Sequence, residues 1–119
     1  MRTYQSMNID FETKHKLPFE AAPWEGNLIV DEGFMRFRIG TCEGLWRHTD
    51  KHYEILAVMN DKPGNGHFED VLQWFEHSCK RDKRKLKISE VWNKAFKKHL
   101  IKKRGFRKIG LDDVEKTIR

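Results

Sequence analysis

A short segment with two glycines is the first part of the sequence whose residue types favour binding chemistry. Residues 62–67 read Lys-Pro-Gly-Asn-Gly-His and lie between an apolar stretch and a segment with helical spacing. Backbone N–H groups in such a loop, together with the start of a helix, form a concave site for phosphate oxygens. Gly64 and Gly66 would let a ligand approach the backbone closely. Since a Gly-x-Gly pair alone is weak evidence, a plain tight turn is the alternative.

Two common phosphate-binding motifs are excluded at this segment. No Lys-Ser or Lys-Thr pair follows the glycines, as a P-loop requires. Glu69 stands where a dinucleotide-binding fingerprint has its third glycine. The segment therefore predicts an anion-binding loop of another kind.

Glu54 is the side chain best placed for proton transfer. It stands in the apolar run 53–59, and a carboxylate among apolar neighbours has a raised pKa, which suits a base that works near neutral pH. A hydrated or salt-bridged glutamate is the alternative interpretation. Glu90, on a second predicted strand, is the next candidate for the same role.

The histidines and cysteines favour neither a metal site nor thiol chemistry. His48 and His52 are four residues apart in a segment that reads as a turn, and the sequence has no Cys-x-x-Cys or His-Glu-x-x-His pattern. Cys79 falls on the apolar face of a predicted helix, and Cys42 lies in a predicted loop. Two cysteines are too few for a disulfide framework, so we expect two free thiols.

The elements that would position these residues follow one another as strand, glycine loop, helix, strand and helix. The run 53–59 is nearly all apolar, as in a central strand that is buried on both faces. Apolar residues with the spacing of one helical face predict a helix over 68–80: Phe68, Val71, Leu72, Phe75 and Cys79. A strand over 86–92 and a helix from its N-cap Asn93 to Arg104 follow, and Gly105 ends that helix. This order predicts a parallel pair of strands with a right-handed crossover.

Shorter elements are predicted on either side of this βαβα unit. Strands are expected at 28–30, at 34–39 and around 45–46, with turns at 31–33 and between Gly40 and Gly44. One short helix or strand is expected beyond Phe106. We therefore expect a single α/β domain over residues 1–119, with a mixed sheet and helices on both of its faces.

Composition and charge indicate one soluble domain. The 119 residues include no apolar run of about 18 and no secretory signal, so we expect a cytoplasmic protein that does not span a membrane. The net charge of +6 is uneven, because residues 80–108 hold 14 lysines or arginines and two acids. This segment would attract nucleic acid, an acidic protein or a phosphorylated cofactor, or it forms a solvated helix face.

From Tyr53 to Phe106 the sequence resembles the core of the Gcn5-related N-acetyltransferase family. The resemblance covers about half of the chain and rests on the order and spacing of its pieces rather than on any single one. These pieces are the run 53–58, the segment 63–68, the helix 68–80, the strand 86–91, Asn93, and the closing 102–106 with its Gly-Phe pair. In that family the fourth strand ends in an Arg/Gln-x-x-Gly-x-Gly/Ala loop, and the fifth strand leads to an Asn at a helix start.

The resemblance implies that the protein binds acetyl-coenzyme A. The diphosphate of coenzyme A would be held by the backbone of the loop, with Lys62 as its basic side chain: Pro63, Gly64, Asn65, Gly66, His67 and Phe68. The pantetheine arm would pair with the end of the preceding strand, as another strand would: Ala57, Val58 and Met59. Asn93 would lie near the same arm, where the two parallel strands part.

Two positions differ from the family pattern. Asp61 stands where the family has the Arg or Gln that begins the loop. The tyrosine that protonates the leaving thiolate would fall at Leu100 or Ile101, and neither side chain can donate a proton. The N-terminal helices that shape the acceptor pocket in the family are expected to be shortened in this chain.

Two functions follow from these features. The first is direct transfer of an acetyl group from acetyl-coenzyme A to an amine, in a ternary complex, with Glu54 as the base. The second is a module of the same fold that uses the basic segment 80–108 to bind nucleic acid or an acidic partner. A homodimer that serves a structural role is a third possibility.

Overall fold

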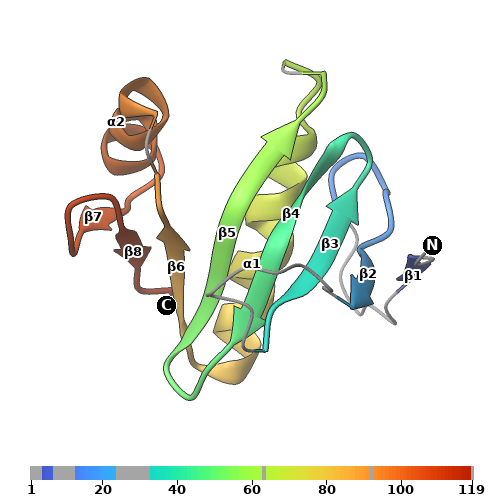
Figure 1. Cartoon of the computed structure of the whole chain (residues 1–119), viewed down its shortest axis with the longest axis horizontal. Coiled ribbons are helices and arrows are strands. Elements are labelled where there is room, and N and C mark those ends of the chain that lie inside the picture. Colours follow the sequence, from blue (N-terminus) through green and yellow to red (C-terminus); the bar gives the residue numbers. More distant parts are fainter. Residues whose placement is uncertain (1–3, 7–12, 24–32, 63, 92, 119) are drawn as a thin grey trace.

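One mixed sheet and two helices make up the described part of the chain. The computed structural model describes residues 4–6, 13–23, 33–62, 64–91 and 93–118. The strands and helices are drawn in Figure 1 and have the following bounds: β1 Gln5–Ser6, β2 Glu20–Pro23, β3 Met35–Ile39, β4 Cys42–His48, β5 His52–Asn60, α1 His67–Asp82, β6 Lys85–Ser89, α2 Lys94–Lys103, β7 Arg107–Lys108 and β8 Val114–Lys116.

The sheet has the strand order β1-β2-β3-β4-β5-β6-β8-β7. The strand pairs are antiparallel, except that β5 and β6 run parallel with α1 as the connection between them. The parallel pair predicted from the βαβα order is therefore confirmed. Because α1 joins two neighbouring parallel strands, its first turn lies at the end of the sheet where β5 finishes (Figure 1).

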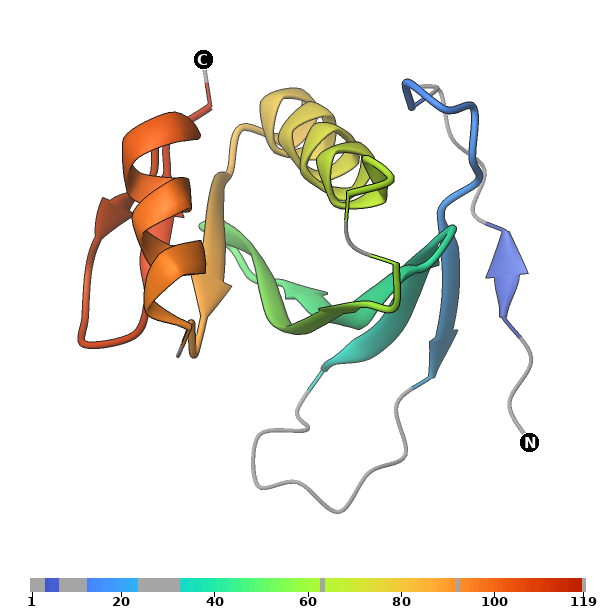
Figure 2. The same cartoon turned by 90° about the horizontal axis from the view of Figure 1, so that it is seen from above.

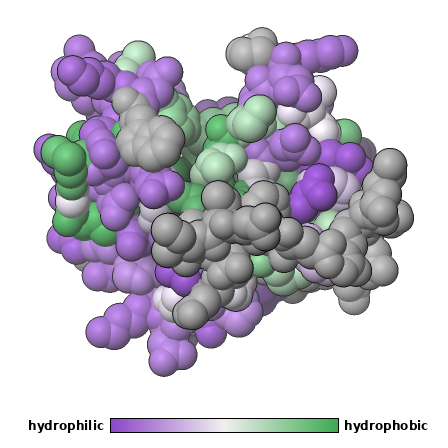
Figure 3. Space-filling view, viewed as in Figure 1, coloured by the Kyte–Doolittle hydropathy of each residue, from purple (hydrophilic) through white to green (hydrophobic). Residues whose placement is uncertain are grey.

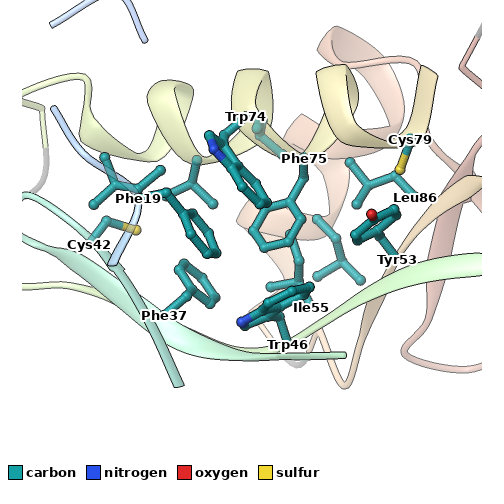
Figure 4. Packing of buried hydrophobic residues seen from close by; sticks show 14 of the residues in the cluster. Phe19, Phe37, Cys42, Trp46, Tyr53, Ile55, Trp74, Phe75, Cys79 and Leu86 are labelled. Atoms are coloured by element: carbon teal, nitrogen blue, oxygen red, sulfur yellow. The ribbon is translucent and has the colours of Figure 1, made fainter. Parts of the chain in front are cut away.

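Helix α1 covers one face of the sheet and closes the main core (Figure 2). Its apolar side chains point at the middle strands (Figure 4). Phe75 of α1, Phe37 of β3 and Ile55 of β5 are all fully buried between them. The N-terminal segment completes this layer, because the ring of Phe19 stacks on that of Trp74 with 3.6 Å between centroids. Burying so many aromatic rings is the main apolar contribution to stability in a chain of this size.

Helix α2 begins and ends where the sequence predicts. The Asn93 side chain accepts a hydrogen bond from the Phe96 N–H at 2.9 Å, and Gly105 follows the helix with φ 80°. Leu100 is fully buried in the same core as α1. Arg104 pairs with Glu69 at 2.8 Å, which ties the end of α2 to the first turn of α1.

The opposite face of the sheet carries a separate small cluster of Phe34, Leu45 and Leu56. Within the described ranges, no helix packs on this face of β3, β4 and β5, which differs from the expectation of helices on both faces. Neither described helix is long and apolar enough to cross a bilayer.

The start of β5 is anchored by a buried carboxylate on β8. Glu115 is 5% exposed, its Oε2 lies 2.9 Å from His52 Nε2, and its Oε1 accepts a hydrogen bond from Arg107 at 2.5 Å. The bonds from Arg107 and His52 lower the pKa of Glu115 to about 2, although burial opposes this shift. The paired end of β5 is therefore held by charge as well as by packing.

Several predicted boundaries are wrong in detail. Gly44 lies inside β4 rather than in a turn, so β4 is longer than the predicted strand around 45–46. Helix α1 extends to Asp82, and the predicted basic turn after Lys80 is partly helical. The segment beyond Phe106 forms the strands β7 and β8. The strand predicted at 28–30 and most of the turn at 31–33 lie outside the described residues.

Candidate ligand-binding cleft

The two parallel strands part halfway along β5. Their pairing runs from His52 opposite Lys85 to Leu56 opposite Ser89, and β5 then continues to Asn60 without β6 beside it. A cleft of about 440 Å³ opens at this point, within the size range of small-molecule sites. It is lined by residues of β5, β6 and the start of α2: Ala57, Val58, Met59, Ile88, Ser89, Glu90, Val91, Asn93 and Phe96. Figure 3 shows apolar surface recessed beside the polar surface of the α2 side.

A β-bulge shapes the β5 wall of the cleft. Glu43 pairs with Met59 and Leu45 pairs with Leu56, so two residues of β5 stand opposite Gly44 alone. Ala57 takes a left-handed conformation with φ 57°, which costs energy for a residue with a side chain. A Cβ atom on Gly44 would lie 3.1 Å from the Ala57 carbonyl oxygen and 2.9 Å from the Phe37 ring, so only glycine fits opposite the bulge.

The opposite wall of the cleft, at the end of β6, also contains a residue with strained backbone. Glu90 also has a φ of 57°, and its N–H donates to Asp113 Oδ1 at 3.0 Å. Non-glycine residues held in this conformation are enriched at ligand-binding and catalytic sites. Two such residues line this cleft: Ala57 in β5 and Glu90 immediately after β6.

The structure brings together four of the site residues predicted from sequence. Ala57, Val58, Met59 and Asn93 line one cleft, although Asn93 is far from the other three in sequence. Ser89, Val91 and Phe96 also line the cleft and were not assigned to a site. The signal for Ser89 is a polar residue at the end of an alternating strand, and Phe96 was recognised only as a core residue of α2.

The glycine loop lies next to the cleft without lining it. Lys62 and Gly64 are exposed, Gly64 has a φ of 90°, and a Cβ atom there would meet no atom within 4 Å. Asn65 Nδ2 donates to the Thr41 hydroxyl at 2.7 Å, and His67 Nδ1 accepts from the Thr41 N–H at 2.9 Å. These side chains therefore fix the loop to the β3–β4 turn. Pro63 lies outside the described residues.

The first turn of α1 supplies free backbone donors beside the loop. The His67 N–H is bonded to the Asn65 side chain and the Asp70 N–H to the Gly66 carbonyl, whereas the Phe68 and Glu69 N–H groups have no acceptor among the described residues. Such donors and the helix dipole favour an anion. The Phe68 ring packs against Phe96 at 5.1 Å, which connects this turn to the cleft wall.

Gly66 does not provide space for a ligand, contrary to the sequence-based prediction. A Cβ atom on Gly66 would lie 2.7 Å from the imidazole of His15. His15 Nδ1 in turn lies 2.7 Å from Asp70 Oδ2, and Asp70 is fully buried. The N-terminal segment therefore packs on this side of the loop, which leaves Gly64 as the glycine that is open to a ligand.

Glu54 is buried in a polar cluster one residue away from the cleft. Its carboxylate accepts hydrogen bonds from the Ser89 hydroxyl and from Arg47 Nε at 2.8 Å, and Lys87 Nζ lies 3.8 Å away. Burial raises the pKa of Glu54, but the bonds from Ser89 and Arg47 and the positive charge of Lys87 together lower it below its usual value. The expectation of a raised pKa is therefore wrong, and Glu54 reaches the cleft only through Ser89.

The two cysteines and the two positions aligned with the family tyrosine supply no reactive group to the cleft. Cys42 and Cys79 are free and inaccessible, and burial raises the pKa of each thiol to about 12. Leu100 is in the core and Ile101 is 37% exposed, and neither hydrocarbon side chain can donate a proton. Among the residues that the structure describes, no group of three or more His, Cys, Asp or Glu side chains is arranged to hold a metal ion.

The basic segment 80–108 is divided between the two ends of β6. One group of basic residues surrounds the end of α1, before β6 begins, and another lies on α2, after β6 ends. A strand of this length separates them by about 16 Å. Several of these side chains are already paired with acids: Arg81, Lys85, Lys87, Lys97, Arg104 and Arg107. The segment therefore does not form one continuous surface of free positive charge.

Comparison with known proteins gave no match to a family model, to a curated protein or to a solved structure.

Proposed function

We propose that the protein is an N-acetyltransferase that transfers an acetyl group from acetyl-coenzyme A directly to an amine. The observation that carries this proposal is the pair of parallel strands β5 and β6, which part at a bulge beside the start of α1. An extended chain that contains amide groups fits such an opening, because it can bond to the free backbone of a strand. Pantetheine is a chain of this kind.

The order of elements around the cleft supports the same proposal. A strand, a glycine loop and a helix are followed by the parallel strand, then by Asn93 at a helix start and by the Gly105-Phe106 pair. This order resembles the Gcn5-related N-acetyltransferase family. In this proposal, β5 and β6 take the places of the family's fourth and fifth strands.

Coenzyme A would lie along β5, with its diphosphate at the start of α1. The backbone of Ala57 to Met59 would bond to the two pantetheine amides and to the thioester carbonyl. The free N–H groups of Phe68 and Glu69, together with the open side of Gly64, would hold the diphosphate. Lys62 is exposed at this loop and would supply positive charge in place of the missing family Arg or Gln.

The transfer itself requires a neutral amine. Its nitrogen attacks the thioester carbonyl carbon, the C–N bond forms, the C–S bond breaks, and the thiolate of coenzyme A leaves and takes a proton from water. The amine loses its proton through the Ser89 hydroxyl, which donates its own proton to Glu54. Because its pKa is lowered, Glu54 is ionised at neutral pH and ready to accept this proton. Glu90 lines the cleft directly and is the second candidate for the acceptor of this proton.

Binding of the cofactor is the first test of the proposal. Thermal unfolding should shift upward with coenzyme A or acetyl-coenzyme A, by about 2.7 kcal/mol when the ligand is at 100 times its Kd. Lys62→Glu should weaken binding by about tenfold, as expected for one lost charged contact. The matched control is Lys80→Glu, the same charge change at the other end of α1, which should bind normally.

Activity is tested separately by release of free thiol and by mass spectrometry of the acceptor. Glu54→Gln and Glu90→Gln should be compared at pH 7.5, where loss of the proton acceptor should lower kcat by about 10²- to 10⁴-fold. Absence of any thermal shift at millimolar acetyl-coenzyme A would overturn the proposal, and so would an acceptor that gains no acetyl group in the presence of bound cofactor.

A further inference from the structure

A second hollow lies on the other side of the bulged part of β5. It has a volume of about 230 Å³ and is lined by Tyr4, Arg36, Glu43, Gly44, Leu45, Ala57 and Met59. Ala57 and Met59 line the first cleft as well, so both spaces adjoin this part of β5. A group bound in the second hollow would therefore approach the same bulge as a thioester held in the cleft.

The charged side chains of this hollow have unused bonding capacity. Neither Arg36 nor Glu43 forms a hydrogen bond or ion pair with any described residue, although each is half-buried. Arg36 instead lies over the ring of Tyr4, with its guanidinium carbon 4.9 Å from the ring centroid. The neighbouring Arg38, by contrast, is bonded to Glu20 through two nitrogens. Arg36 and Glu43 thus share one hollow without a hydrogen-bonded partner among the described residues, although Arg38 stands opposite Glu43 on the paired strand and acts on it electrostatically.

The strand register sets the spacing of these two charges. Arg36 pairs with Leu45, and Glu43 stands two residues before Leu45 on β4, so the two are diagonal neighbours on one face of the sheet. Diagonal positions of this kind are about 7–8 Å apart. This separation leaves room for a small molecule with opposite charges at its two ends. Glu43 is also the β4 partner of Met59, which places the anionic end beside the bulge.

We infer that this hollow binds a small acceptor in which a primary amine and an acidic group, a carboxylate or a phosphate, are a few bonds apart. This inference rests on the proposed function. Glu43 accepts hydrogen bonds from the ammonium group and places it next to the bulge, and Arg36 donates to the acidic group through its planar guanidinium. The apolar wall of Leu45 and Met59 admits the carbon skeleton between them.

Acceptor selectivity tests this inference in the presence of saturating acetyl-coenzyme A. The amines to be compared are an α-amino acid, its amide, O-phosphoethanolamine and an alkylamine of the same length, with thiol release as the readout. The acidic amines should exceed the amide and the alkylamine by about 10- to 100-fold in kcat/KM, since hydrogen bonds between charged groups are lost in the neutral ones. The α-amino acid and O-phosphoethanolamine distinguish a carboxylate from a phosphate.

Variants separate the hollow from the cofactor site. Arg36→Gln should remove the preference for acidic amines, and Glu43→Gln should raise KM for every amine. The matched control is Arg84→Gln, since Arg84 also lies over a tyrosine ring but just before β6, away from the hollow, and it should keep the preference. Coenzyme A binding should be unchanged in Arg36→Gln and Glu43→Gln, which also shows that they are folded.

The outcomes distinguish this inference from the proposed function. Equal or better turnover of the neutral amines, or an acid preference that survives Arg36→Gln, would overturn the inference and leave the acetyltransferase proposal intact. If coenzyme A does not bind, the proposed function fails, and binding of the amino acid or of O-phosphoethanolamine alone, measured by thermal shift, still decides whether the hollow recognises a zwitterion.

Discussion

The two halves of β5 are both largely apolar but have opposite environments. Residues 52–56 lie between β4 and β6 and are largely buried, with Ile55 fully enclosed. Residues 57–60 keep β4 on one side but have no β6 on the other, and Met59 is 60% exposed. An apolar run therefore predicts a strand but not its burial, because burial depends on how far the neighbouring strand extends. The cleft exists because β6 is shorter than β5.

The largest expected difference between the halves is in core packing. Ile55→Ala should lower the free energy of unfolding by about 2–5 kcal/mol, because it leaves a cavity among fully enclosed rings. Met59→Ala should change it by less than about 0.5 kcal/mol. Urea denaturation at pH 7 measures both. Similar losses for the two variants would show that the second half of β5 is buried in solution.

The charged anchor of the first half should give the next largest effect. Glu115→Gln should cost about 1.5–3 kcal/mol at pH 7, since it weakens the charged hydrogen bonds from His52 and Arg107. The pKa of Glu115 is about 2, below its usual value of 4.5, so its contribution is complete above about pH 4.5 and is lost as the pH falls toward 2.

Denaturation of both proteins at pH 7, 4 and 2.5 checks the sign of this pH dependence. The difference between the variant and the original chain should shrink as the pH falls. Glu76→Gln is a control with a more exposed ion pair to Lys116, and it should cost less than about 1 kcal/mol. A difference that grows toward low pH would contradict the assignment.

Gly44 stands opposite the bulge in the second half of β5, where a larger residue should disturb the strand. Gly44→Ala places a methyl group against the enclosed ring of Phe37 and the Ala57 carbonyl, so it should cost about 1–3 kcal/mol and weaken coenzyme A binding. Gly110→Ala, where the nearest atoms are 3.8 Å away, should have little effect on either property. Thermal unfolding with and without coenzyme A measures both, and normal binding by Gly44→Ala would show that the close fit of Gly44 against the bulge is not needed for binding.

The smallest expected effect is at the open side of the cleft. Asn93→Ala should lower stability by about 1 kcal/mol through loss of the α2 cap, whereas Asn93→Ser keeps a capping oxygen. If Asn93 also binds the cofactor through its amide, Asn93→Ser should bind coenzyme A more weakly despite normal stability. Equal affinities of Asn93→Ser and the original chain would limit Asn93 to the cap.

The sequence predicts the central βαβα unit well because its signals are local. The apolar face of α1, the cap at Asn93 and the stop at Gly105 each depend on residues within one or two turns. The β5 residues and Asn93 could be predicted to meet at one cleft because parallel strands end on the same side of a sheet.

Other features of the site depend on contacts that no local pattern encodes. The lowered pKa of Glu54 results from Ser89, Arg47 and Lys87, which lie on neighbouring strands, so an apolar local sequence was misleading. The contact between His15 and Gly66 joins residues from distant parts of the chain. Gly44 was assigned to a turn because a glycine opposite a bulge cannot be distinguished from a turn glycine without the partner strand.

Residues 57–60 of β5, which have no β6 beside them, also bear on how the chain should behave at high concentration. Backbone groups without a neighbouring strand are a template on which a second polypeptide can add by hydrogen bonding. A pantetheine arm would cover the same groups, so cofactor loading would also guard against aggregation. The empty protein should then self-associate more readily than the loaded one.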